Sequence, residues 1–205
     1  MPKVSTREYR VLTQLNPAQS ESKKLIDSDY YVEGYAARFE PYVMREFDNV
    51  KVYEQIDPSA FEGADMSDVI MQYDHEGRVM ARTSNGTLVI DVRSDGLFIG
   101  ADLSKSDASR ELYNDIAEGL VTKMSWSFIV EEDEYDTTTR TRLVKKIRKV
   151  YDVSAVSIPA NNDTTIQTRS YFDGVIEAEK LEKLERRKKA LKLKALLLEE
   201  EFKNE

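Results

Sequence analysis

The segment KMSWSF at residues 123–128 lies at the centre of one of two long strand-like runs in the sequence. Side chains alternate between the two faces of a β-strand, so Ser125 and Ser127 are expected on one face and the neighbouring Met, Trp and Phe on the other. The apolar face indicates a strand that is buried in a core. The two hydroxyls opposite it are either a hydrogen-bonded pair in the sheet, which is the commoner arrangement, or the place of a nucleophile.

The two runs, residues 121–135 and 142–158, flank the segment TTTRT and predict a β-hairpin. Before the hairpin, Ser104 followed by Asp107 predicts the start of a helix, and Gly119 lies near the expected end. The helix itself is predicted from apolar residues that recur at helical spacing: Ala108, Leu112, Tyr113, Ile116, Ala117 and Leu120.

Two turn signals lie further upstream, NG at residues 85–86 and DG at residues 95–96. They divide residues 78–103 into three strands and predict an antiparallel meander. The residues expected on the core face of the middle strand are Leu88, Ile90 and Val92.

The two ends of the chain differ from this central part. Residues 1–28 are polar and weakly patterned, which predicts a flexible segment with at most one short strand at Glu8–Leu12. Residues 171–205 are predicted to form a helical tail, in which Lys and Glu surround an apolar heptad seam and Lys188 occupies a core position. The seam consists of Leu181, Leu184, Leu191, Ala195, Leu198 and Phe202. Such a stripe favours pairing with one partner helix, or with a second copy of the chain.

Strands are also predicted at residues 30–39 and 50–56, the second ended by Pro58. The central part therefore contains about six or seven strands and at least one helix. We expect an α+β protein in which residues 29–170 form a mostly antiparallel β-barrel with packed helices, followed by the amphipathic C-terminal helix. A sandwich is the alternative way to bury such strands.

The composition excludes several classes of function. A formal charge of −8 argues against a general nucleic-acid binder, because such proteins concentrate Lys and Arg. The chain has no cysteine and a single histidine, His75, so neither a disulfide nor a zinc site is expected, and no cofactor is predicted. The N-terminus lacks the apolar core of a signal peptide, and no run approaches the roughly 20 apolar residues of a membrane span. We expect a cytoplasmic protein.

Three residue types that can form a hydrolytic site occur on separate β elements. His75 lies in the polar segment MQYDHEGRV and is either a surface residue or a general base. Asp152 lies on a mostly apolar strand face, where an ionised carboxylate needs a partner such as an imidazolium. A serine, a histidine and an acid together can perform nucleophilic catalysis, but their spacing leaves open whether they meet. An esterase is disfavoured because no G-x-S-x-G segment occurs.

Four segments, in this order, carry a resemblance to a known family: YYVEGYAARFE, YDHEGRVMART, GLVTKMSWSFIV and YDVSAVSIPAN. They resemble the prohead, or procapsid maturation, proteases of tailed bacteriophages, a family related in fold to the herpesvirus assemblins. The resemblance covers about residues 30–165. It implies that His75 is the base, Ser125 the nucleophile and Asp152 the third member of a serine protease triad.

Three positions depart from the family pattern. Ser127 stands where the family usually has glycine, and it either narrows the site or offers a hydrogen bond. Ala81 replaces the glycine that is common before Arg-Thr. Asp152 stands where many relatives have Glu and is about one methylene shorter, so its reach to His75 is the point that a structure must test.

The resemblance also implies a biological role. Such proteases act inside the immature capsid in the host cytoplasm and cut scaffold protein, or the scaffold-like N-terminal segment of the major capsid protein, and often themselves. The expected partners are those proteins, and a homodimer is left open. The tail at residues 171–205 would recruit the enzyme to a helical scaffold or self-associate. The alternative is an inactive assembly or scaffold module with the same fold.

Overall fold

The computed structural model describes residues 7–17, 24–47, 50–157, 178, 180–192 and 194. Contacts divide the chain into two units, Met1–Asp163 and Thr164–Glu205, and each is described by itself. In the second unit, residues 180–192 are helical, and three predicted seam residues, Leu181, Leu184 and Leu191, are exposed. The other seam residues, Ala195, Leu198 and Phe202, lie outside the described residues.

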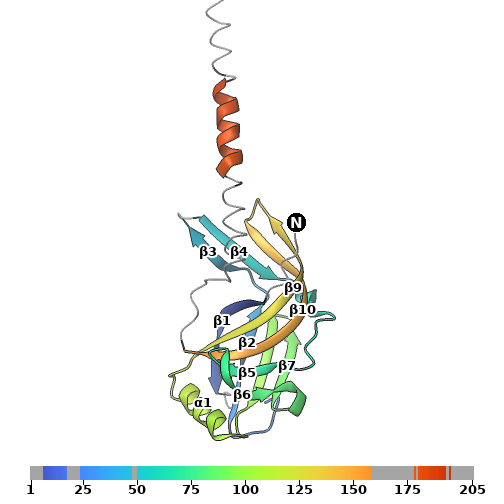
Figure 1. The fold of residues 1–205 in the computed structure, drawn as a ribbon, viewed down its shortest axis with the longest axis vertical. Helices are drawn as coiled ribbons and strands as arrows, with labels where there is room; N and C mark the ends of the chain where they lie inside the picture. Colours follow the sequence, from blue (N-terminus) through green and yellow to red (C-terminus); the bar gives the residue numbers. More distant parts are fainter. Residues whose placement is uncertain are drawn as a thin grey trace, which may run out of the picture. The chain divides into compact units, whose positions relative to one another are not determined.

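The first unit is mostly β, with one α-helix in its described part. Its strands are β1 (Glu8–Pro17), β2 (Tyr31–Arg38), β3 (Tyr42–Phe47), β4 (Val50–Ile56), β5 (Ile70–Tyr73), β6 (Glu76–Arg82), β7 (Leu88–Arg93), β8 (Gly96–Asp102), β9 (Lys123–Asp136) and β10 (Thr141–Val156). The α-helix is α1 (Asp107–Ala117), and two short 3-10 helices are η1 (Pro58–Phe61) and η2 (Thr83–Asn85). Figure 1 shows β9 and β10 as the long strands of the unit, with β3 and β4 at the end opposite α1.

The strands pair along an open path, in the order β3-β4-β10-β9-β1-β2-β8-β7, and β5 joins both β10 and β6. Most pairs are antiparallel, but β10 runs parallel to β4 along one half and to β5 along the other. No pairing between β3 and β7 closes the sheet within the described residues. The prediction of a closed barrel is therefore corrected to a mixed, mostly antiparallel sheet that remains open.

The predicted hairpin of the two long runs is confirmed as β9 and β10, which pair along most of their length. The apolar face of KMSWSF is also confirmed. The rings of Trp126 and Phe128 stack with their centroids 3.9 Å apart, and Met124 beside them is also fully buried. Burying side chains of this size stabilises a fold by roughly 1.5–3 kcal/mol each, so this face anchors β9 in the core.

The predicted meander is correct in its second half only. β7 and β8 form the hairpin expected at residues 95–96. β6, however, pairs with β5 instead of β7, because η2 and Gly86, whose φ is 75°, turn the chain away from a two-residue hairpin. On the middle strand Leu88 is buried as predicted, whereas Val92 is 43 % exposed. β5 and β3 were not predicted.

The helix is confirmed with a later start. Its N-cap is Ser106, whose hydroxyl accepts a hydrogen bond from the backbone N–H of Ser109, and not Ser104 as predicted. Leu112 and Ile116 are buried as expected, but Leu120 lies past the end of the helix and is 71 % exposed.

β1 is the largest departure from the sequence prediction for this unit. The strand runs from Glu8 to Pro17, twice the length expected, and pairs with both β9 and β2 inside the sheet. Part of the segment predicted as flexible, residues 1–28, is thus an interior strand. Charged residues such as Glu8 and Arg10 usually lie at exposed positions of a strand. Both are buried here, because they pair with each other and with the opposite charges of Glu54 and Arg142 from other strands.

Candidate active site

The register of three strands brings the two serines and the acid to one face of the sheet. Ser125 of β9 lies opposite Val11 of β1 and Ser154 of β10, and Ser127 lies opposite Asp152. Since side chains that pair across strands point to the same face, this register alone places the acid beside the two hydroxyls.

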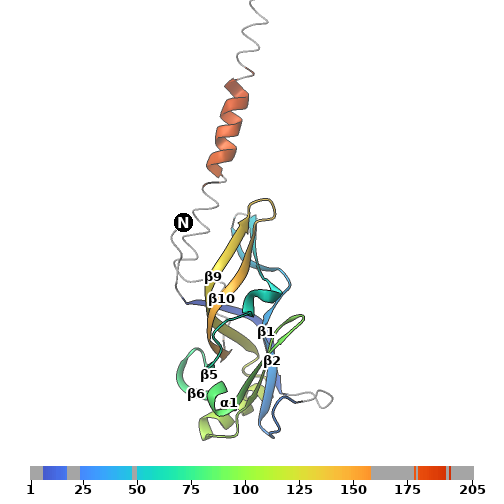
Figure 2. The ribbon, with the colours of Figure 1, turned by 90° about the vertical axis from the view of Figure 1, so that its right-hand side faces the viewer.

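His75 reaches this face from the turn between β5 and β6. β5 pairs in parallel with residues 152–155 of β10, and both views show the two strands side by side (Figures 1 and 2). The turn begins after Tyr73, which lies opposite Ala155. His75 and the preceding Asp74 have left-handed φ values of 62° and 50°, a conformation that is uncommon for residues other than glycine. Asp74 holds the turn in place: its N–H donates to Ala155 O at 2.9 Å, and its carboxylate accepts from the N–H and hydroxyl of Ser157.

The three predicted residues lie within hydrogen-bond distance of one another. His75 Nε2 is 2.6 Å from Ser125 Oγ, and His75 Nδ1 is 2.5 Å from Asp152 Oδ1. The expected contact between the shorter acid and the imidazole is therefore present. Asp152 is fully buried and Ser125 is 1 % exposed, while the His75 side chain retains 16 % exposure. The Tyr9 ring meets the imidazole edge-on, with centroids 4.8 Å apart.

The carboxylate of Asp152 is ionised in this environment. Burial raises the pKa of Asp152, but the hydrogen bond and charge of His75, followed by the hydroxyls of Ser127 and Ser154, outweigh burial and hold the pKa below its usual range. An ionised carboxylate accepts only, so the ring proton lies on Nδ1 and Nε2 is left free to accept the proton of Ser125. This is the tautomer that a serine nucleophile requires.

Residues 18–179, which include all three side chains, match the family described as Caudovirus prohead serine protease. The chain belongs to this family. It is a phage serine protease of capsid maturation. No curated protein and no solved structure matches the chain. The matched stretch begins after β1, so of the two strands that pair with β9, β1 lies outside the match and β10 lies inside it.

Ser127 of the protease binds Asp152 and not His75. Its hydroxyl donates to Asp152 Oδ2 and accepts from Arg7 Nε at 2.8 Å. The hydrogen bond that this departure from glycine could offer is therefore present. Arg7 also donates to Asp152 Oδ2 directly. Sequence reasoning missed Arg7, because the residue lies in the segment predicted as flexible and no motif marks it.

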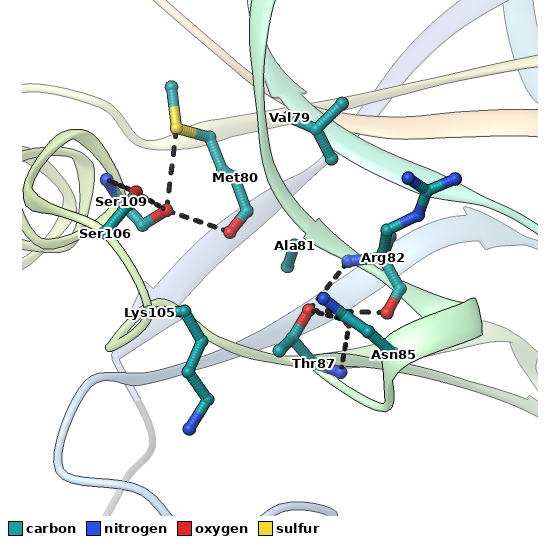
Figure 3. A pocket seen from close by; sticks show the side chains of 9 residues that line it. All are labelled: Val79, Met80, Ala81, Arg82, Asn85, Thr87, Lys105, Ser106 and Ser109. Atoms are coloured by element: carbon teal, nitrogen blue, oxygen red, sulfur yellow. Dashed lines mark hydrogen bonds between the residues drawn. The ribbon is translucent and has the colours of Figure 1, made fainter.

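The third departure, Ala81, is a buried residue of β6. It lines a cavity of about 180 Å³ between β6 and the start of α1, shown in Figure 3. The residues around that cavity are Val79, Met80, Ala81, Arg82, Asn85, Thr87, Lys105, Ser106 and Ser109. None of the three predicted site residues is among them.

Two further properties of the described residues bear on the chemistry. No group of three or more His, Asp or Glu side chains in them could hold a metal ion. None of their helices is long and apolar enough to cross a membrane.

Proposed function

We propose that the protease cleaves peptide bonds with Ser125 as nucleophile, His75 as general base and Asp152 as the orienting acid. The observation that carries this is the unbroken line of hydrogen bonds from Asp152 Oδ1 through both ring nitrogens to Ser125 Oγ. The position of each side chain supports its role. The Ser125 hydroxyl contacts Nε2 of His75, and Asp152 contacts the other ring nitrogen, Nδ1.

In the first half of the reaction, Ser125 Oγ attacks the carbonyl carbon of the scissile bond while its proton passes to His75 Nε2. The imidazolium that forms is stabilised by the Asp152 carboxylate. His75 then gives the proton to the leaving amine, and the C–N bond breaks to leave an ester on Ser125. In the second half, His75 removes a proton from water, which attacks the ester carbonyl. His75 then returns this proton to Ser125 Oγ as the acyl C–O bond breaks, which releases the acid product and restores the free hydroxyl.

The expected substrates are the scaffold protein, or the scaffold-like N-terminal segment of the major capsid protein, and the protease itself. Membership in a prohead protease family supports substrates that are present inside the immature capsid in the host cytoplasm. Self-cleavage would let the fragments leave the capsid once the shell is complete. A homodimer remains an expectation of the same kind.

Ser125→Ala tests the chemical assignment. We expect the purified chain to shorten with time and to cleave capsid or scaffold protein. In the variant, the rate of cleavage should fall by a factor of about 10⁶. Ser67→Ala is the matched control, because Ser67 is an exposed serine whose hydroxyl donates to Asp65, outside the proposed site. Full activity in Ser125→Ala would contradict the assignment. A folded wild-type chain without activity toward either protein would favour the inactive assembly module instead.

The helical tail is the proposed recruitment element. Leu181, Leu184 and Leu191 are exposed at heptad-compatible spacing, and salt bridges Arg186–Glu182 and Lys188–Glu185 lie on the same helix. Deleting residues 175–205 should leave cleavage of a short peptide unchanged and reduce incorporation into particles. Packaging as efficient as that of the full chain, or an unfolded truncation product, would contradict this role.

A further inference from the structure

Arg7 binds the far oxygen of the acid in the proposed site. Its guanidinium donates to Asp152 Oδ2 and, through Nε, to Ser127 Oγ at 2.8 Å. The same group lies over the rings of Tyr9 and Tyr151, at 5.3 and 4.7 Å from their centroids. The side chain is 36 % exposed, so it reaches from the surface to a carboxylate that is wholly buried.

We propose that Arg7 is a positioning residue that holds Asp152 Oδ2 together with Ser127, so that Oδ1 stays directed at His75. This inference rests on the proposed function, because it assigns Arg7 a role in the same site. Arg7 lies outside residues 18–179 that match the family, directly before β1, a strand that the family match does not include.

The two carboxylate oxygens have different partners. Oδ1 binds His75 and the hydroxyl of Ser154 at 2.7 Å, whereas Oδ2 binds Ser127 and Arg7. Without the Arg7 fork, the carboxylate would lose its only permanently charged partner among the described residues. Rotation of the carboxylate about its χ2 would then misdirect the imidazole, since χ2 of Asp is a soft torsion.

The geometry suits arginine in particular. Nε and a terminal nitrogen of one planar group bind two different oxygens, and the ring faces of two tyrosines hold the plane. A lysine would retain the charge but offer a single point donor, so it should restore electrostatics without restoring alignment.

Arg7 also affects the charge state of the base. His75 is faced by Asp152 from β10, Ser125 from β9 and the Tyr9 ring from β1, while the carboxylate of neighbouring Asp74 is bound by Ser157. Arg7 is thus the cation that offsets the Asp152 charge next to the ring. Removing it leaves that negative charge uncompensated and favours the imidazolium.

The single histidine makes this effect directly measurable. We would follow the ring resonances of His75 by NMR as a function of pH, in an untagged chain that carries Ser125→Ala so that it stays intact. Arg7→Met in that background should move the titration midpoint to higher pH by roughly half a unit to one unit. Arg7→Lys should leave the midpoint near that of the Ser125→Ala chain. Arg38→Met is the matched control, because it removes an arginine from an exposed ion pair with Asp95.

Kinetics in the otherwise native chain provide the second readout. Arg7→Met should lower kcat/KM for a peptide roughly tenfold above pH 8 and more strongly below pH 7, because the base is then more fully protonated. Arg7→Lys should recover the pH dependence but not the whole of kcat. A purely structural role would lower the rate equally at every pH.

Each outcome decides the inference. An upward shift of the midpoint in Arg7→Met, absent from Arg38→Met, supports it. No shift, a downward shift, or a variant that no longer folds would overturn it, the last because Arg7 would then support the sheet and not the acid. The titration does not depend on cleavage, so failure of the proposed function, seen as activity in Ser125→Ala, is distinguishable from failure of this inference.

Discussion

The two faces of β1 carry two charged clusters that differ in kind. Successive residues of the strand alternate in direction, so Glu8 and Arg10 enter one cluster, while Tyr9 lies at the site together with Arg7, which directly precedes the strand. The partners across the sheet alternate in the same way: Glu8 lies opposite Phe128 on the core face, and Tyr9 lies opposite Ser127 on the site face.

The core-face cluster consists of Glu8, Arg10, Glu54 and Arg142, all buried. Arg10 lies 2.5 Å from both Glu8 and Glu54, and Arg142 lies 2.7 and 2.8 Å from the same two carboxylates. Two positive and two negative charges therefore neutralise one another. Burial raises the pKa of Glu54, but the charge of Arg10 and its hydrogen bond, with help from Arg142 and Tyr42, lower it to about 2.

The difference between the faces is one of charge balance and access. In the core-face cluster every group keeps its charge at neutral pH, and none is open to solvent. At the site the balance includes an imidazole, which is 16 % exposed and changes its charge during the proposed reaction. The core-face cluster anchors β1 in the sheet. The anchored strand in turn places Arg7 beside Asp152 at the site. Substitutions on the two faces should separate activity from stability.

His75→Ala should give the largest effect of all. No other histidine can replace it, so we expect a loss of about 10⁶ in rate with little change in the free energy of unfolding. In the native chain, activity should rise with pH through the neutral range as the imidazole loses its proton. Peptide cleavage between about pH 5 and 8 checks both points. A flat profile, or a working variant, would indicate another base, such as a lysine.

Asp152→Asn should be the next largest effect on the site face. The amide keeps the volume but cannot stabilise the imidazolium, and it can hold the ring in the wrong tautomer, so a loss of roughly 10²–10⁴ in kcat is expected. Activity should not be wholly erased, because Ser125 and His75 remain in contact. Steady-state kinetics with a peptide measure the loss. Unchanged kcat would mean that the site operates as a Ser–His dyad.

Arg142→Met should reverse the pattern, with a large effect on stability and a small one on chemistry. The variant leaves Arg10 as the one cation of the cluster beside Glu8 and Glu54, and it also removes the pairing of Arg142 with Asp133. Breaking a buried ion pair costs roughly 3–5 kcal/mol. Denaturant unfolding measures this cost. The matched control is Arg148→Met on the same strand, where the side chain is exposed and a change within about 0.5 kcal/mol is expected.

If the folded fraction of Arg142→Met also lost catalysis, the two faces would be coupled through β1. The claim that one face sets stability and the other sets activity would then be wrong. Activity per folded molecule within about twofold of the native value supports independent faces, since the mutation leaves every contact of Asp152 in place.

These two faces also mark what the sequence could and could not provide. The β9 and β10 hairpin, β2, β4 and α1 were predictable, because each carries a periodic apolar pattern that reports burial locally. β1 does not: its alternating charges are typical of an exposed strand, and only Glu54 and Arg142, distant in sequence, reveal that Glu8 and Arg10 are buried.

The same reason limited prediction of the site. His75, Ser125 and Asp152 were predicted as site residues from the four family-like segments, and the structure brings their side chains within hydrogen-bond distance. Arg7 has no motif, and its contact with Asp152 depends on the register of β1 against β9, which local pattern does not encode. The NG signal predicted that β6 pairs with β7, which would have closed the sheet through β5 and β10. The short helix η2 instead turns the chain away at this point, so β6 pairs with β5 alone and the sheet stays open.

Acidification should unfold the chain through the core face. The pKa of Glu54 is about 2 when folded, below its ordinary value of 4.5, and the pKa of Glu8 is also lowered, because both arginines favour the carboxylates over the cost of burial. A lowered folded pKa contributes stability that is present above the unfolded value and lost as pH falls through the folded value. The Glu54 contribution, about 3 kcal/mol, should disappear between about pH 4.5 and 2.

Unfolding free energies at a series of pH values measure this loss. Glu54→Gln should be less stable at neutral pH but should lose less on acidification, because it has no proton to gain. An acid transition of equal size in Glu54→Gln would place the sensitive carboxylates outside the core-face cluster.

Ser127→Ala should give the smallest effect and makes the finest distinction on the site face. Asp152 keeps His75, Ser154 and Arg7 when the hydroxyl is removed, and the Arg7 nitrogen that loses its acceptor belongs to a partly exposed side chain that water can reach. We expect kcat/KM to fall several-fold, about 1 kcal/mol, in line with the loss of one hydrogen bond to a charged group that retains others.

Ser154→Ala removes a bond to the oxygen that also binds His75, so it should cost somewhat more than Ser127→Ala. The two variants, compared by peptide cleavage, report which carboxylate oxygen matters for the imidazole. Complete inactivity in a folded Ser127→Ala chain beside an active Ser125→Ala chain would reverse the roles of the two serines, and with them the direction in which Arg7 supports the site.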